Sequence, residues 1–201
     1  MAPDLAQVDG MPRRHRIFVT GISVHIIQRG NNRLSIFGSA TDCGHFLELL
    51  RRSARNFCVS VHGFVLMSTH YHVIATPTSD GGLPKMMKAL DGGYVRYFNK
   101  RHERIGTLWN GRYRGLAIED ERYWLTCLRY IEQNPVRAGM VQSPSDYQWS
   151  SYSAHAFGRW PTWLTPHAVY QSLGRNDGER QRAYRELCGQ SVKSDDPLLL
   201  L

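Results

Sequence analysis

Hydrophobic and polar residues alternate with two different periods along this chain, and they divide it into extended and helical segments. Residues 16–30 are rich in β-branched side chains with partial alternation, which is typical of a strand. Residues 59–77 are also extended, and they form two β runs that are joined or interrupted near Ser68 and Thr69. Residues 104–118 predict a loop followed by a further short strand.

Three segments carry apolar residues at helical spacing. Residues 41–58 form the first, and Thr41 or Asp42 is the expected cap at its start. Residues 83–102 form the second. Residues 119–135 form the third, and acidic residues crowd its first turn, where they suit the helix dipole.

The order of these segments is strand, helix, strand, helix, strand, helix, and turns of hairpin length are few. Such an order favours an α+β fold in which an antiparallel sheet carries helices on one face. Residues 1–12 are expected to form a flexible leader. From about residue 136 onward the pattern predicts short helices and loops, and 157–201 is expected to be a C-terminal helical extension and tail.

The composition fits a folded protein that binds polyanions. Of the 201 residues, 42% are hydrophobic, which is enough for a core and too many for a disordered chain. The formal net charge of +8 favours a nucleic acid as partner, because each Lys or Arg near a phosphate releases counterions. A soluble basic surface without a partner is the alternative, and charge alone does not separate the two.

Cysteine usage and the lack of long apolar runs point to the cytoplasm. No apolar segment of signal-peptide length opens the chain, and no run approaches the length of a membrane span. We therefore expect a cytoplasmic protein with no membrane partner. The four cysteines form no CxxC pair and are expected to be reduced thiols: Cys43, Cys58, Cys127 and Cys188.

Two histidines stand at alternate positions of the second extended segment, in the sequence MSTHYHVIATP. Residues i and i+2 of a strand point to one face, so His70 and His72 can hold one metal ion while Tyr71 points to the other face. Two imidazoles leave a metal ion short of ligands, so a third ligand must come from elsewhere. A pair of hydrogen-bonded structural histidines is the alternative for so short a motif.

A tyrosine and an asparagine lie four residues apart in LRYIEQNPVRAG, residues 128–139. On a helix this spacing places Tyr130 and Asn134 on one face, one turn apart. A tyrosine hydroxyl is a candidate nucleophile, and an asparagine carbonyl oxygen is a candidate metal ligand. Because Tyr123 and Cys127 share that face, a packing stripe is the alternative.

Basic and aromatic residues are interleaved through residues 94–114. Cations track phosphates, while aromatic rings stack on unpaired bases. An amphipathic helix with a solvated basic face is the alternative, but the pattern continues through a loop that has no helical face. We therefore expect this block to bind nucleic acid, with these candidate residues: Arg96, Lys100, Arg101, Arg104, Trp109, Arg112, Tyr113 and Arg114.

Five blocks follow one another in the order QRGNN, GFVLMSTHYHVIATP, YVRYFNKRHERIGTLWNGRYR, YIEQNPVRAGMV and YQWSSY. In this order they resemble the REP-associated tyrosine transposases, which belong to the IS200-like, single-tyrosine HUH (His, hydrophobic, His) transposase superfamily. The resemblance implies an HUH domain at 13–156, followed by the extension at 157–201. Two departures are Tyr71, where an aliphatic residue is more common, and MSTH, where the family often has proline and then asparagine or aspartate.

The resemblance implies a ferredoxin-like or RRM-like fold, in which helices flank an antiparallel sheet and the HUH motif lies on a central strand. It also implies a reaction: Tyr130 would attack a phosphodiester of single-stranded DNA and form a 5′-phosphotyrosine link. His70 and His72 would hold Mg²⁺ or Mn²⁺, and Asn134 matches the position where the family places a third, amide ligand.

The partner implied by the resemblance is single-stranded DNA, in the form of imperfect palindromic repeats that fold into hairpins. Further DNA contacts are expected from Arg13, Arg14, Arg29 and Arg137. The protein would act near the nucleoid as a monomer or a homodimer.

Three other functions stay open on the sequence alone. A non-catalytic nucleic-acid-binding module with an RRM-like sheet would bind without cutting. A metal-dependent nuclease that uses water would cut without becoming attached to DNA. A host-adopted relative would cleave repeats without moving itself.

Overall fold

The structure is a computed structural model and describes residues 18–189, so the predicted leader and the predicted DNA contacts of Arg13 and Arg14 lie outside the described residues. The strands are β1 (Ser23–Arg29), β2 (Val59–Met67), β3 (His70–Pro77) and β4 (Arg114–Ile118). The helices are α1 (Ala40–Asn56), α2 (Gly82–Arg101), α3 (Glu121–Glu132), α4 (Asn134–Arg137), α5 (Tyr152–Phe157), α6 (Ala168–Gln171) and α7 (Asp177–Gly189), with short 3₁₀ turns η1 (Asn31–Arg33) and η2 (Pro144–Asp146).

The four strands form one antiparallel sheet in the order β2-β3-β1-β4. Together with the chain order β1-α1-β2-β3-α2-β4, this is the split βαβ arrangement of ferredoxin-like domains. The predicted α+β fold is therefore confirmed. The tight turn at Ser68 and Thr69 joins β2 to β3, and β3 with its two histidines is a central strand.

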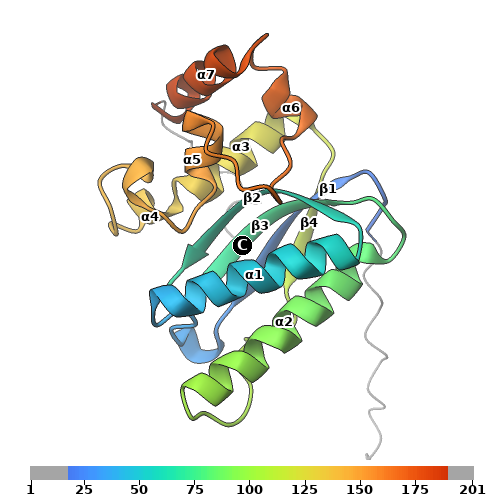
Figure 1. The fold of residues 1–201 in the computed structure, drawn as a ribbon, viewed down its shortest axis with the longest axis vertical. Helices are drawn as coiled ribbons and strands as arrows, with labels where there is room; N and C mark the ends of the chain where they lie inside the picture. Colours follow the sequence, from blue (N-terminus) through green and yellow to red (C-terminus); the bar gives the residue numbers. More distant parts are fainter. Residues whose placement is uncertain (1–17, 190–201) are drawn as a thin grey trace, which may run out of the picture.

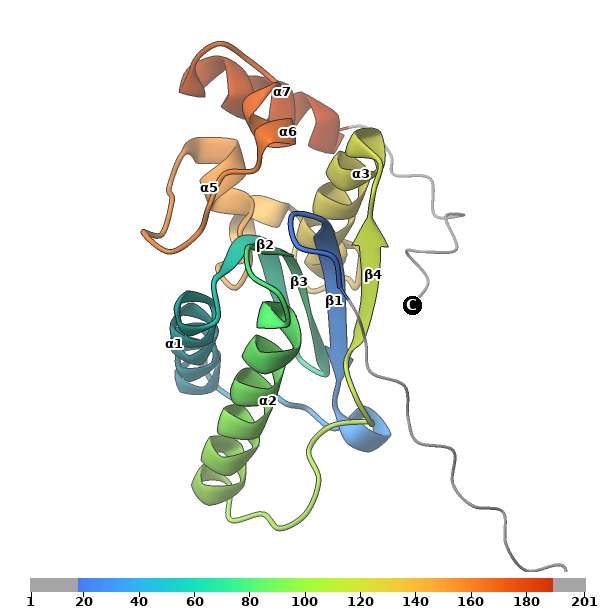
Figure 2. The ribbon, with the colours of Figure 1, turned by 90° about the vertical axis from the view of Figure 1, so that its right-hand side faces the viewer.

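Helices cover both faces of the sheet (Figures 1 and 2). On one face, Tyr71, Val73 and Ala75 of β3 pack beneath α1 and α2. On the other, Ile74 belongs to a second apolar cluster, with Leu128 of α3. The expectation of helices on a single face is wrong, because β2 and β3 are apolar on both faces and each face needs a cover. Within residues 18–189 no helix is long and apolar enough to cross a membrane.

The start of α1 differs from the sequence prediction. Its N-cap is Ser39, whose hydroxyl accepts a hydrogen bond from the backbone N–H of Asp42. The expectation that Thr41 or Asp42 caps the helix is wrong, since both residues lie inside the first turn. A serine two residues upstream is an equally good cap by residue type, so the local pattern could not choose between them.

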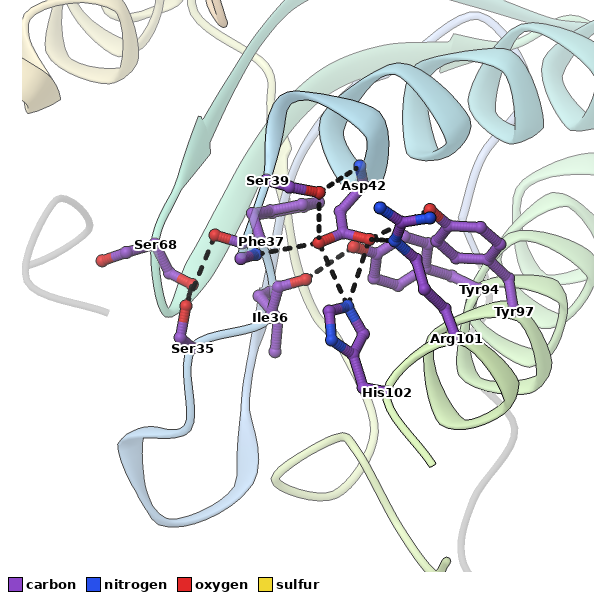
Figure 3. Close-up of polar contacts among 11 residues, drawn as sticks. Ser35, Ile36, Phe37, Ser39, Asp42, Ser68, Tyr94, Tyr97, Arg101 and His102 are labelled. Carbon is purple, nitrogen blue, oxygen red and sulfur yellow. Dashed lines mark hydrogen bonds and ion pairs between the residues drawn. The ribbon is translucent and has the colours of Figure 1, made fainter. Parts of the chain in front are cut away.

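The Asp42 carboxylate ties the first turn of α1 to the last turn of α2 (Figure 3). It is fully buried and accepts hydrogen bonds from the Tyr97 hydroxyl at 3.0 Å, the Ser39 hydroxyl at 3.0 Å and His102 Nε2 at 3.2 Å. Arg101 Nε lies 3.3 Å from the same carboxylate. Burial raises the pKa of Asp42, but the hydrogen bonds from Ser39, Tyr97 and His102 outweigh burial and lower it below its usual 3.8.

Replacing Asp42 by asparagine should lower the free energy of unfolding at pH 7 by about 2 kcal/mol, because buried donors lose an ionised acceptor. A lowered native pKa stabilises the fold above the usual value, and this stability is lost as pH falls through the native value. Asp42→Asn should therefore flatten the fall in stability below about pH 4. Chemical unfolding at several pH values measures both effects, with the exposed Asp80→Asn as control. Equal curves for the two variants would contradict this role.

Candidate active site

β3 directs His70 and His72 to the sheet face that α3 covers, with their ring centres 5.1 Å apart. Burial, with a smaller contribution from the charge of Arg29, lowers the pKa of His70 to about 4. Burial, together with neighbouring His25, also lowers the pKa of His72 well below its usual value. Both rings are therefore neutral near pH 7, and the neutral imidazole is the form that binds metal ions.

Helix α3 and the start of α4 bring the tyrosine and the asparagine to the same place. The ring centres of Tyr130 and His72 are 6.1 Å apart, and the rings are nearly perpendicular. The side-chain amide nitrogen of Asn134 lies 3.3 Å from His72 Nε2. The predicted nucleophile Tyr130 and the predicted metal ligands Asn134 and His70 therefore all lie next to His72 in one chain.

Arg137 belongs to α4 and lies against the tyrosine. Its guanidinium carbon is 4.4 Å from the centre of the Tyr130 ring, in cation–π contact. Arg137 is exposed and Tyr130 is half-buried, so the pair borders the solvent. This places a positive charge next to the candidate nucleophile.

A further histidine, which the sequence analysis did not select, lies behind His72. His25 of β1 is 1% exposed, and its Nε2 is 2.9 Å from His72 Nδ1. The two rings are stacked with centres 5.1 Å apart. Burial lowers the pKa of His25 to about 4, so this ring is also neutral near pH 7. His72 is therefore held at both nitrogens, by His25 on one side and Asn134 on the other.

Arg29, Gly30 and Asn32 of the QRGNN segment form one wall of a cleft of about 400 Å³ beside His70, and Arg33 and Asn110 also line it. A Cβ atom on Gly30 would overlap the carbonyl of Leu34, so the tight turn after β1 requires glycine there. Asn32 and Arg33 have left-handed backbone angles, with φ of 49° and 57°. Strained backbone of this kind is common at functional sites, and here it borders the histidines.

The predicted DNA-binding residues are divided between the two faces of the sheet. Arg114 lies directly across from Ile27 on β1, so its exposed side chain leaves the sheet on the histidine face. Arg112 and Tyr113 line a second cavity of about 630 Å³, which borders α2 on the opposite face. Three further predicted residues lie in the second half of α2. Arg96 and Lys100 are exposed, and Arg101 is paired with Asp42.

Trp109 and Arg104, from the same basic and aromatic block, also make internal contacts. Trp109 is 8% exposed, and its ring packs against Tyr71 and Tyr94 in the core. The guanidinium carbon of Arg104 lies 5.8 Å from the ring centre of Phe98. In this structure the Trp109 ring stabilises the fold, and it offers little surface on which a base could stack.

The sequence was compared with protein families and with curated proteins. Residues 18–134 match the family described as IS200-like transposases, which is more than half of the chain. The chain belongs to this family. No curated protein matches this transposase sequence.

Solved structures give a second comparison. A REP-associated tyrosine transposase bound to a REP hairpin matches with a TM-score of 0.57 and 19% identity, over 78% of this chain and 93% of that one. The two transposases share a fold. A putative transposase from Deinococcus radiodurans R1 has 19% identity and a TM-score of 0.43, over 56% of this chain and 91% of that one.

A tRNA(His) guanylyltransferase from Saccharomyces cerevisiae also matches, with 11% identity and a TM-score of 0.43, over 93% of this chain and 86% of that one. TM-scores of 0.43 do not establish a common fold.

The tyrosine helix of this transposase is anchored by a buried carboxylate that the sequence analysis also missed. Glu132 follows Tyr130 by two residues and is 0% exposed. It accepts hydrogen bonds from the Ser151 hydroxyl, from His155 Nδ1 at 2.8 Å and from the Tyr184 hydroxyl at 2.6 Å. These donors come from α5, its preceding residue and α7, so part of the C-terminal extension holds the end of α3 in place.

Replacing Glu132 by glutamine should destabilise the fold by about 2–3 kcal/mol, because the amide nitrogen cannot accept a hydrogen bond and leaves a buried donor without its partner. Thermal unfolding measures the loss as a lower Tm. The matched control is Glu121→Gln, at an exposed position in the first turn of the same helix. A Tm for Glu132→Gln equal to that of the control would show that the network does not anchor the helix.

Proposed function

We propose that this protein is a metal-dependent endonuclease and strand transferase that acts on single-stranded DNA through a 5′-phosphotyrosine intermediate. The observation that carries the proposal is the meeting of Tyr130 with His72 and Asn134 in one chain of an IS200-like transposase. Tyr130 is the proposed nucleophile. His70, His72 and Asn134 are the proposed metal ligands.

The residues around His72 fit a divalent metal ion. The described residues contain no cluster of three His, Cys, Asp or Glu side chains that could hold a metal. The Asn134 amide oxygen is the proposed third protein ligand, and because the amide nitrogen faces His72 Nε2 at 3.3 Å, the amide group would turn over to present that oxygen. Burial keeps His70 and His72 neutral, which leaves a nitrogen lone pair on each ring for coordination. Imidazole together with an amide oxygen suits Mn²⁺ and Mg²⁺, and the site lacks the thiolates that favour zinc.

When bound, such an ion would polarise the scissile phosphate and neutralise charge on its oxygens. The reaction itself uses the chain's own tyrosine. Tyr130 Oη loses its proton and bonds to phosphorus, the P–O3′ bond breaks, and the leaving 3′ oxygen takes up a proton. A 3′-hydroxyl of a second strand can then attack the phosphotyrosine, which restores a phosphodiester and releases Tyr130. No high-energy cofactor is needed.

Hairpin-forming repeat DNA is the proposed substrate, because a structural neighbour with the same fold is bound to a REP hairpin. Two groups of cations lie beside the proposed chemistry: Arg137 next to Tyr130, and Arg29 with Arg33 around the cleft at His70. These cations would guide the DNA backbone past the tyrosine. The exposed predicted contacts on α2 and in the following loop, Arg96, Lys100 and Arg112, would bind the hairpin at a distance from the cleavage site.

The tyrosine mechanism predicts a covalent protein–DNA adduct. End-labelled single-stranded hairpin oligonucleotides, taken from repeats near the gene, are incubated with the protein and Mn²⁺ and run on a denaturing gel. Tyr130→Phe should abolish the adduct, because phenylalanine has no nucleophilic oxygen. His72→Gln should reduce adduct formation by more than about tenfold while hairpin binding persists.

The matched control is Tyr123→Phe, which changes a tyrosine on the same helix two turns before Tyr130. This variant should form the adduct like the wild-type protein. Cleavage without an adduct would favour a water-using nuclease. Binding without cleavage, across several repeat hairpins, would favour a non-catalytic binding module.

A further inference from the structure

His25 is a buried histidine whose side chain has one hydrogen-bond partner among the described residues. Its Nε2 is hydrogen-bonded to His72 Nδ1, while its Nδ1 is buried and has no hydrogen-bond partner among the described residues. An unpartnered buried nitrogen costs stability that an apolar side chain of similar size would not. Packing therefore does not explain an imidazole at this position.

His62 shows the contrast within the same sheet. It is 4% exposed, and both of its nitrogens are satisfied, Nδ1 by the backbone carbonyl of Thr165 at 2.8 Å and Nε2 by the Thr76 hydroxyl at 2.9 Å. It thus joins β2, β3 and the loop before α6 as an ordinary structural histidine. Within residues 18–189, His25 makes a single side-chain hydrogen bond, to His72, so its role depends on what that bond does.

The bond from His25 determines which nitrogen of His72 carries the proton. The Asn134 amide nitrogen can only donate a hydrogen bond, and it lies 3.3 Å from His72 Nε2. His72 Nε2 must therefore be the acceptor and carry the lone pair. A neutral imidazole then carries its proton on Nδ1, which faces His25 Nε2 at 2.9 Å and donates to it. Metal coordination needs this same tautomer, with the Nε2 lone pair facing Asn134.

We propose that His25 is a positioning residue, which accepts the hydrogen bond from His72 Nδ1 and so holds the His72 Nε2 lone pair toward the metal ligand Asn134. The inference rests on the proposed metal site and adds a residue to it. Partners of this kind behind metal-binding histidines typically change metal affinity by about 10–100-fold. The stacking of the two rings further restricts the rotation of His72.

The first test reads the tautomer directly in the metal-free protein. Long-range ¹H–¹⁵N correlation spectra of protein with ¹⁵N-labelled histidine identify which ring nitrogen is protonated, and the His72→Gln variant assigns the signal. Protonated Nδ1 and bare Nε2 on His72 support the proposal. The opposite tautomer overturns it, and this result needs no metal, no DNA and no mutation at position 25.

The second test measures Mn²⁺ affinity by electron paramagnetic resonance. His25→Phe keeps an aromatic ring and removes the acceptor, and it should weaken Mn²⁺ binding by about 10–100-fold. His25→Gln places a side-chain oxygen near the position of Nε2 and should restore affinity to within a few-fold of wild type. His62→Phe is the matched control, because it removes an equally buried strand histidine and should leave Mn²⁺ affinity unchanged.

The outcomes distinguish a failure of the positioning role of His25 from a failure of the proposed metal site. Wild-type protein that binds no Mn²⁺ overturns the metal site and, with it, this role of His25. Wild-type binding with equal affinity in His25→Phe overturns the positioning role alone. If His25→Phe does not fold, the tautomer of His72 in the wild-type protein and the affinity of His25→Gln decide.

Discussion

The antiparallel pairing of β3 with β1 determines which side chains meet at the proposed active site. In this register His70 lies opposite Arg29, and His72 lies diagonally from His25, so these four side chains share the face under α3. Tyr71 points the other way and is fully buried beneath α1 and α2. A shift of this register by one residue would move the histidines of one strand to the opposite face of the sheet. Burial of apolar residues on both faces of β3 opposes such a slip.

The position of α3 is the second requirement, because the proposed nucleophile comes from this helix and the proposed amide ligand comes from the start of α4. Leu128 and Ile131 are buried against the sheet, which leaves Tyr130 at the edge of the apolar stripe and next to His72. Glu132 then connects the end of the helix to Tyr184 of α7. The last described helix is thus part of the support for the tyrosine, although it lies beyond the region that matches the family.

Features that depend on one segment alone could be predicted from the sequence. Alternation at His70 and His72 gave their shared face, and helical spacing placed Tyr130 near Asn134. The role of His25 could not be predicted, because it depends on the register between two strands 47 residues apart. The burial of Glu132 could not be predicted either, because its position in the helix pattern is that of an ordinary polar residue. Its hydrogen-bond donors come from residues 19 to 52 positions later in the chain. Trp109 belongs to a basic, aromatic block, yet its ring packs in the core, since the loop before β4 folds back onto α2.

The central claim is that Tyr130 itself becomes joined to DNA. Protein incubated with hairpin DNA and Mn²⁺ would be digested with nuclease and protease, and the peptides analysed by mass spectrometry. The account predicts a nucleotide linked through its 5′ phosphate to Tyr130, in the peptide that contains YIEQNPVR. A nucleotide on another residue, or cleaved DNA with no modified peptide, would contradict it.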